Sequence, residues 1–246
     1  MIRSRLAGQF VLSPNVEPRR NGRPVDMLVL HYTGMATAAR ALQWLCNPAS
    51  GVSCHYLIDS DGAIVQMVGE EMRAWHAGAS SWEGEADTNS RSIGIEIHNP
   101  GHMISYDPFP PAQMHAVTAL CLDILGRHTI APRRVLAHSD VAPGRKVDPG
   151  ENFDWGLLYR HGIGHWTPPE DMDGGPRLVP GCEGIAVEDL QAMLVQYGYG
   201  APRSGVYDVA TETVVAAFQR HFRPQRCDGI ADRSTVATLR ALLQGL

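Results

Sequence analysis

Apolar residues gather in short continuous runs through the first two thirds of the chain. Runs at Met27–His31, Ser92–His98 and Arg134–His138 are typical of strands that are buried on both faces. The segment His55–Val68 reads as two further strands around an Asp-Gly pair at positions 61 and 62, which favours a tight hairpin. The pattern therefore predicts at least five strands in the first 150 residues.

Amphipathic segments lie between these runs. Apolar residues at helical spacing predict helices over Ala36–Leu45 and Ala112–Arg127, with Gly126 near the end of the second. Strands that alternate with helices indicate an α/β domain, here with a mixed central β-sheet flanked by helices.

The pattern changes after Trp166. Residues 167–180 are rich in proline, glycine and acidic residues and read as a linker. We therefore divide the chain into a domain over 1–166, the linker, and a small three-helix domain over 181–246. The three predicted helices are Ala186–Tyr197, Thr211–Phe222 and Ser234–Leu243.

The three-helix domain carries a weak internal repeat. The stretches GVYDVAT and DGIADRST precede its second and third helices and share Gly, Asp and Thr at matching spacing. Asp208 and Asp232 are each expected to cap the helix that follows, because a carboxylate accepts hydrogen bonds from the free N–H groups of a first turn.

The composition argues against some classes of binding partner. The formal net charge is -5 and no basic run occurs, which argues against a nucleic acid as the main partner. No apolar stretch is long enough to cross a bilayer, so we expect no transmembrane segment. The five cysteines are scattered and form no CxxC pair, which indicates no disulfide framework and fits a reducing compartment.

The first residues, MIRSRLAGQFVLSPNVEPRRNG, lack the apolar core of a signal peptide. We therefore expect a cytoplasmic protein. A periplasmic protein from which an export signal was removed would show the same sequence, so that alternative stays open.

Three predicted strands end in polar residues that can do chemistry. His31 and His138 end the first and third apolar runs, and Glu96 lies near the end of the second. The third run continues into AHSDVAPGRKVDPG, which adds Lys146 and Asp148 and which its prolines and glycine predict to be irregular rather than helical. Residues at strand ends of an α/β sheet tend to form its active site.

This set of side chains suits metal-assisted hydrolysis of an amide. Two histidines and a carboxylate are a common three-ligand zinc set, with water in the fourth position. Glu96 can then serve as general base, and Lys146 can stabilise an oxyanion. Taken singly, each residue also has an ordinary explanation: a hydrogen-bonded histidine, a paired carboxylate, a solvated lysine or a turn aspartate. Their joint placement favours the catalytic interpretation.

Five motifs then identify a family. LHYTG, HYLIDSDGAIVQMV, RAWHAG, SIGIEI and AHSDVAPGRKVDPG, in this order over residues 27–150, resemble the zinc-dependent N-acetylmuramoyl-L-alanine amidases of the second amidase family. That family includes a cytoplasmic anhydromuropeptide amidase of cell-wall recycling and a periplasmic lipoprotein. The resemblance implies zinc ligands His31, His138 and Asp148, a catalytic acid/base Glu96, and a transition-state-stabilising Lys146.

The resemblance also implies a substrate groove. The RAWHAG segment lines it in the family, which suggests the substrate-binding residues Arg73, Trp75, His76, Ala77 and Gly78, and we add Asn99. Phage and recognition-protein members carry a catalytic tyrosine where this chain has Cys54, and a cysteine in place of the ligand aspartate. Both differences favour the recycling branch.

The C-terminal domain resembles the three-helix peptidoglycan-binding domain of wall hydrolases. The whole chain is thus expected to hydrolyse the bond between N-acetylmuramic acid, or its anhydro form, and L-alanine of the stem peptide, with muropeptides or peptidoglycan as substrate. One alternative is a non-catalytic recognition protein on the same fold, and a weaker one is a zinc hydrolase for an unrelated amide. The sequence does not indicate an oligomeric state.

Overall fold

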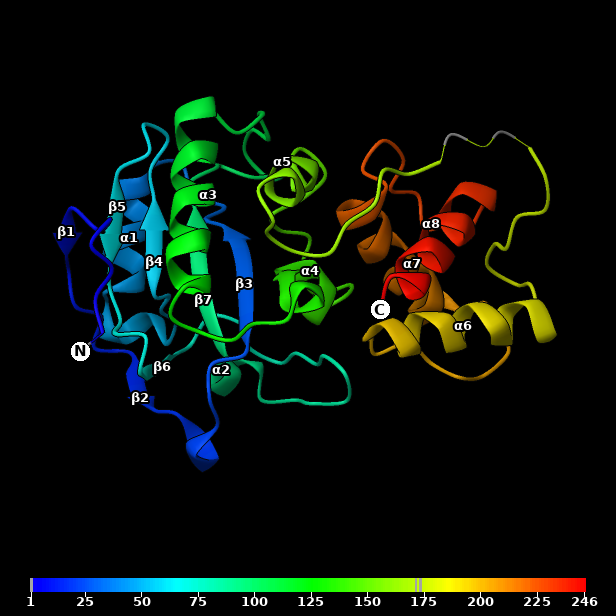
Figure 1. Cartoon of the computed structure of the whole chain (residues 1–246), viewed down its shortest axis with the longest axis horizontal. Helices are drawn as coiled ribbons and strands as arrows, with labels where there is room; N and C mark the ends of the chain where they lie inside the picture. Colours follow the sequence, from blue (N-terminus) through cyan, green and yellow to red (C-terminus); the bar gives the residue numbers. More distant parts are fainter. Residues whose placement is uncertain (1, 171, 173) are drawn as a thin grey trace.

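A computed structural model describes residues 2–170, 172 and 174–246, so two positions of the predicted linker, 171 and 173, lie outside the described residues. The chain forms an α/β part followed by three helices that lie beside it (Figure 1). The predicted fold class is confirmed. The strands are β1 Gln9–Phe10, β2 Val16–Pro18, β3 Met27–Tyr32, β4 Tyr56–Ile58, β5 Ile64–Gln66, β6 Met72–Ala74, β7 Ser92–Ile97 and β8 Val135–Ala137. The α-helices are α1 Ala38–Leu45, α2 Thr88–Arg91, α3 Pro111–Leu125, α4 His138–Val141, α5 Trp155–Arg160, α6 Ile185–Tyr197, α7 Val209–Phe222 and α8 Arg233–Gln244.

The central sheet is mixed. Its order is β1-β5-β4-β7-β3-β8, with β4, β7, β3 and β8 parallel and β5 antiparallel to β4. The predicted hairpin is the β4–β5 pair, and β2 and β6 form a separate two-stranded sheet. Because the four parallel strands run the same way, their carboxyl ends meet at one edge.

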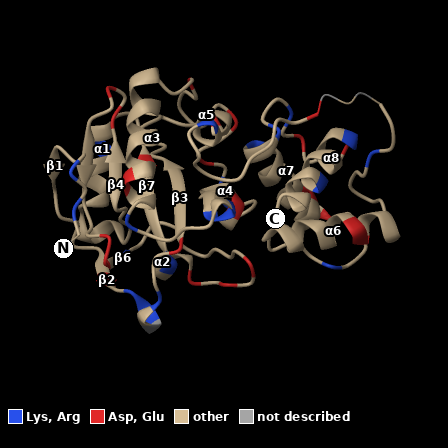
Figure 2. Ribbon diagram, viewed as in Figure 1, with Lys and Arg blue, Asp and Glu red and all other residues tan. Residues whose placement is uncertain are grey.

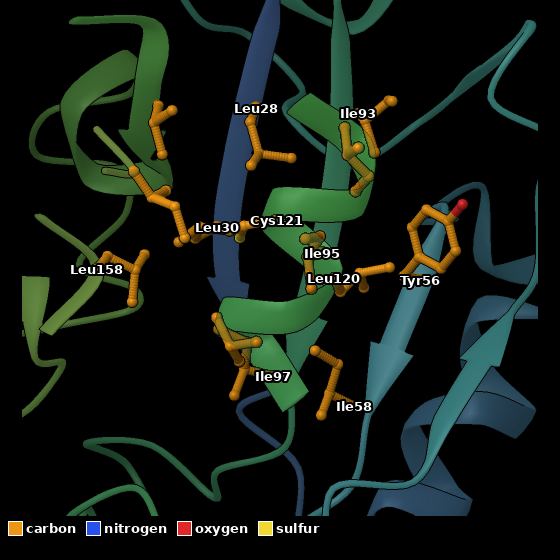
Figure 3. Packing of buried hydrophobic residues seen from close by; sticks show 14 of the residues in the cluster. Leu28, Leu30, Tyr56, Ile58, Ile93, Ile95, Ile97, Leu120, Cys121 and Leu158 are labelled. Atoms are coloured by element: carbon orange, nitrogen blue, oxygen red, sulfur yellow. The ribbon is translucent and has the colours of Figure 1, made fainter. Parts of the chain in front are cut away.

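One face of the sheet packs against α3. Leu28 and Leu30 of β3 and the isoleucines of β7 lie there against Leu120 and Cys121 (Figure 3). Side chains alternate between the faces of a strand, so Met27, Val29 and His31 point to the other face. The continuous apolar character of β3 follows, since both of its faces are covered.

The opposite face is covered in two halves. α1 packs Ala41 and Leu45 against Leu57 of β4. The C-terminal helices cover the other half, because Met27, Val29 and Leu136 share one buried cluster with the side chains of α6, α7 and α8. The C-terminal helices therefore complete the core of the α/β part.

The caps of the C-terminal helices follow the repeat. Asp208 accepts a hydrogen bond from the backbone N–H of Thr211 at 2.8 Å, and Asp232 does the same for Thr235 at 2.9 Å. Both predicted caps are confirmed, and they set where α7 and α8 begin.

The prediction that the AHSDVAPGRKVDPG segment holds no helix was wrong at its start. His138–Val141 forms a single helical turn, α4, so His138 opens a helix rather than ending a strand. The prolines lie at positions 143 and 149, beyond this turn, and do not remove any of its donors.

Several short elements carried no sequence signal. β1, β2 and β6 have only two or three residues, and α2 and α5 have four and six.

Charged residues of both signs are interspersed along the elements (Figure 2). None of the described helices combines the length and the apolar character that a membrane crossing requires.

Candidate metal centre and active site

The three predicted metal ligands converge at the carboxyl edge of the sheet. His31 Nδ1 lies 2.8 Å from His138 Nδ1 and 3.3 Å from Asp148 Oδ2, and His138 Nδ1 lies 3.0 Å from that same oxygen. All three side chains are buried. They form the one group of potential metal ligands found among the described residues.

Hydrogen bonds determine which nitrogen of each histidine is free. Ser92 Oγ donates to the Thr88 carbonyl at 2.7 Å, so it accepts from His76 Nε2 at 3.0 Å. Burial lowers the pKa of His76 well below its usual value, so the ring is neutral and its Nδ1 accepts from His31 Nε2 at 3.0 Å. The lone pair of His31 is therefore on Nδ1.

The same reasoning applies to His138. Its Nε2 lies 3.1 Å from the backbone oxygen of Ala77, and a carbonyl oxygen can only accept. When the ring holds a single proton on Nε2, Nδ1 carries the lone pair and faces Asp148. Two unprotonated nitrogens and a carboxylate oxygen thus converge on one point, which suits a divalent cation.

Charge and spacing fit such an ion. Burial lowers the pKa of His31 to about 4, with His138 adding to the effect and Asp148 opposing it. Burial alone would raise the pKa of Asp148, but the two histidines lower it far below its usual value. Ligand atoms about 2.0–2.2 Å from a tetrahedral zinc ion stand roughly 3.3–3.6 Å apart. The separations of 2.8, 3.0 and 3.3 Å here are slightly shorter, so a small outward movement would admit the ion.

Gly94 of β7 makes room for His76. A Cβ at this position would lie 2.6 Å from the His76 ring and 2.8 Å from Cys54 Sγ. Cys54 is fully buried and does not line the cavity beside the ligands. The glycine of SIGIE is therefore part of the support of His31, a role that the sequence alone did not indicate.

A cavity of about 440 Å³ opens beside the three ligands. Its walls come from β3, β7, α1 and the loop that follows α4. The residues that line it are Tyr32, Thr33, Gly34, Met35, Ala41, Trp44, Leu45, Val52, Ser53, Trp75, His76, Glu96, His138, Arg145, Lys146, Val147 and Asp148.

Glu96 and Lys146 both line this cavity. Glu96 pairs in register with His31 across β7 and β3, so both side chains leave the same face of the sheet. Its Oε2 atom is buried and has no hydrogen-bond partner among the described residues. Burial raises the pKa of Glu96 well above its usual value, with Asp148 adding to the rise and Lys146 opposing it.

The residues expected to bind substrate are not all at the cavity. Trp75 and His76 line it, and Trp75 Nε1 is buried without a hydrogen-bond partner in the described structure. Arg73 forms ion pairs with Glu17 and Asp87, and Asn99 donates to the Asp107 carbonyl at 2.8 Å.

Ala77 and Gly78 contact residues of the site rather than the cavity. The Ala77 carbonyl accepts from His138 and from the Arg145 guanidinium, which also lies against Gly78. Sequence reasoning missed Arg145 and the half-exposed Trp44, which lines the cavity from α1. Neither residue carried a signal, since an arginine in a loop and an amphipathic-helix tryptophan are ordinary on a surface.

Comparison with known proteins settles the family. The family model for N-acetylmuramoyl-L-alanine amidase matches residues 21–151, and a peptidoglycan binding domain model matches residues 183–239. The chain belongs to the N-acetylmuramoyl-L-alanine amidase family. This amidase is thus an enzyme of a metal-dependent family, with one group of described side chains suited to hold the metal.

Relatives of known name support this assignment over both parts of the chain. The amidase is 36% identical to N-acetylmuramoyl-L-alanine amidase AmiD of Escherichia coli K12, over 89% of this chain and 83% of the relative. It is 41% identical to 1,6-anhydro-N-acetylmuramyl-L-alanine amidase AmpD of the same organism, over 59% of this chain and 86% of the relative.

Solved structures agree. E. coli AmiD in complex with the substrate anhydro-N-acetylmuramic acid-L-Ala-D-γ-Glu-L-Lys has a TM-score of 0.78 at 35% identity, covering 93% of both chains. AmpDh3 of Pseudomonas aeruginosa in complex with anhydromuramic pentapeptide also has a TM-score of 0.78, at 33% identity and over 96% of this chain and 98% of that chain.

Proposed function

We propose that this amidase uses zinc, held by His31, His138 and Asp148, to cleave muropeptides between N-acetylmuramic acid, or its anhydro form, and L-alanine. The observation that carries the proposal is the convergence of two histidine nitrogens and a carboxylate beside a cavity. The similarity to enzymes solved with anhydromuramyl peptides supports the substrate class.

Held by these three residues, a zinc ion would lower the pKa of its water to near neutrality and polarise the amide carbonyl. Glu96 takes the proton of the attacking water and delivers it to the leaving nitrogen of L-alanine. Its place at the cavity beside the ligands suits this task, and burial raises its pKa, which makes the carboxylate a stronger base. The Lys146 ammonium stabilises the negative charge that develops on the carbonyl oxygen.

Of the predicted substrate-binding residues, one is proposed to contact the substrate and the others to support the site. Trp75 faces the cavity and is proposed to contact the substrate directly. His76 and Ala77 orient the metal ligands, as outer hydrogen-bond partners do in metal sites. Arg73, Gly78 and Asn99 are proposed to shape the groove from outside it.

The division into a catalytic domain over 1–166, a linker over 167–180 and a peptidoglycan-binding domain over 181–246 is part of the proposal. The cytoplasmic location expected from the sequence stays a prediction. The substrate preference bears on it, because soluble fragments and intact wall occur in different compartments.

The test is a two-substrate assay. Purified zinc-loaded protein is incubated with soluble anhydromuropeptide and, separately, with intact sacculi, and free stem peptide is followed by mass spectrometry. Release from the soluble fragment alone fits a recycling enzyme, and release from both fits a general wall amidase. A protein that takes up no zinc on loading and binds the fragments without releasing stem peptide would instead fit the recognition protein and overturn the proposal.

A further inference from the structure

Asp140 is a fully buried carboxylate two residues after His138. It lies in α4, and its Oδ2 accepts a hydrogen bond at 2.8 Å from the backbone N–H of Ala137, the residue just before His138. This bond caps the single turn on which His138 stands. The backbone of His138 therefore depends on where Asp140 is held.

The other two partners of Asp140 come from the C-terminal helices. The Tyr199 hydroxyl donates to Oδ1 at 2.6 Å, and His221 Nδ1 donates to Oδ2 at 2.6 Å. Both donors are buried. A buried carboxylate is stable only when it is well hydrogen bonded, so Tyr199 and His221 determine the position of Asp140.

His221 is itself fixed from both sides. Its ring stacks on Trp155 with centroids 3.7 Å apart and on Phe222 with centroids 3.9 Å apart. Trp155 belongs to α5 of the catalytic part, whereas Phe222 ends α7 (Figure 1). The stack therefore holds the imidazole at the boundary between the two parts of the chain.

α7 also touches the loop that carries Lys146 and Asp148. A Cβ at Gly144 would lie 2.6 Å from Thr213 Cγ2, so this loop passes directly against the helix. Val141 of α4 is buried in the same cluster as Phe218 of α7. The C-terminal domain thus contacts the metal-ligand segment at three successive points.

We propose that Tyr199 and His221 are positioning residues, which act through Asp140 to hold His138 in the geometry that binds the metal. The inference rests on the proposed metal centre. It gives the C-terminal domain a second role, beside any binding of the wall, as a support of the catalytic site.

The experiment compares metal affinity in full-length variants. Tyr199→Phe removes the hydroxyl and His221→Leu removes the ring donor. Tyr197→Phe is the matched control, because Tyr197 is equally buried two residues away but bonds His165 instead of the metal-ligand segment. His221→Asn is the rescue variant, since its side-chain amide places an N–H near the position of Nδ1.

Zinc affinity is measured by competition with a chromophoric chelator, and the cobalt-substituted proteins are compared by their visible spectra. Urea unfolding midpoints are measured for each variant, so that a change in metal binding can be distinguished from a loss of overall stability. Tyr199→Phe and His221→Leu should weaken zinc binding by about 10-fold or more, as loss of outer-shell partners does, and alter the cobalt spectrum. Tyr197→Phe should stay within about 2-fold of the wild type, and His221→Asn should recover most of the loss.

Zinc affinity in Tyr199→Phe and His221→Leu equal to that of Tyr197→Phe would overturn the inference. His31→Ala separates this result from failure of the metal centre. If His31→Ala loses zinc while the two variants keep it, only the positioning role is wrong. If His31→Ala also keeps zinc, the proposed centre is wrong and the positioning role with it.

Discussion

The backbone of Gly94 lies directly against the ring of His76. A Cβ at position 94 would stand 2.6 Å from that ring, closer than packed atoms tolerate. Because His76 in turn accepts from His31, a substitution on β7 reaches the metal ligand without touching it.

Gly94→Ala should therefore displace His76. We expect a loss of about 1–3 kcal/mol in the free energy of unfolding, as for other overpacked cores, together with weaker zinc binding. Urea unfolding and chelator competition measure the two effects. Gly8→Ala is the control, since nothing lies within 4 Å of the added methyl group. Wild-type zinc affinity in Gly94→Ala would show that His76 does not need its present position.

His76→Phe should keep the shape of the ring while removing its acceptor. His31 Nε2 then loses its partner, and the lone pair is no longer directed at the metal. Zinc affinity is expected to fall by about 10- to 100-fold in chelator competition. The same exchange at the exposed His115 on α3 should leave the affinity unchanged. A direct role of His76 in substrate binding alone would instead raise KM at constant zinc affinity.

Glu96→Gln should separate metal binding from turnover. The amide keeps the size of the side chain but cannot take a proton, so kcat should fall by about 100- to 10,000-fold. Zinc content should remain at one ion per chain, since Glu96 is not among the three ligands. Stem-peptide release by mass spectrometry and metal analysis give the two readings. Glu170→Gln, at an exposed carboxyl, is the matched control.

Glu70 should contribute strongly to the loss of stability at acidic pH. It is fully buried and bonded to Arg127 at 2.6 Å, His128 at 2.7 Å and Tyr56 at 2.5 Å. Burial alone would raise the pKa of Glu70, but these three partners together lower it to about 2. A folded-state pKa below the unfolded value means that the stability is present above about pH 4.5 and is lost as the pH falls toward 2.

Glu70→Gln should accordingly lower stability at pH 7 by about 3 kcal/mol and flatten its dependence between pH 4.5 and 2. Chemical unfolding at a series of pH values provides the measurement. Glu170→Gln again serves as control and should follow the wild-type curve. If the free energy of unfolding of Glu70→Gln fell between pH 4.5 and 2 as steeply as that of the wild type, other carboxylates would be responsible for the acid sensitivity.

Much of this architecture could be predicted from the chain alone, because β3, β7 and β8 are apolar runs and His31, Glu96 and His138 lie at or near their ends. Strand pairing could not, and the register of His31 with Glu96 emerged only in the fold. The turn of α4 was missed since its four residues carry no periodic pattern.

The supports of the site were harder still to foresee. Asp140 reads as one more aspartate in a loop, and its partners Tyr199 and His221 are distant in sequence. Nor does any pattern in β3 indicate that Met27 and Val29 are covered by helices that begin after residue 180. Such long-range packing follows from shape complementarity, which a single sequence does not display.

The core shared between the sheet and the C-terminal helices has a geometrical consequence. A domain joined only by residues 167–180 would occupy many positions relative to the metal centre. The range of distances between them would increase with linker length. In this protein the packed C-terminal helices have one fixed position relative to the metal centre. If these helices bind a glycan strand, the enzyme cuts stem peptides at a constant distance from the bound sugar. A longer linker leaves that distance unchanged.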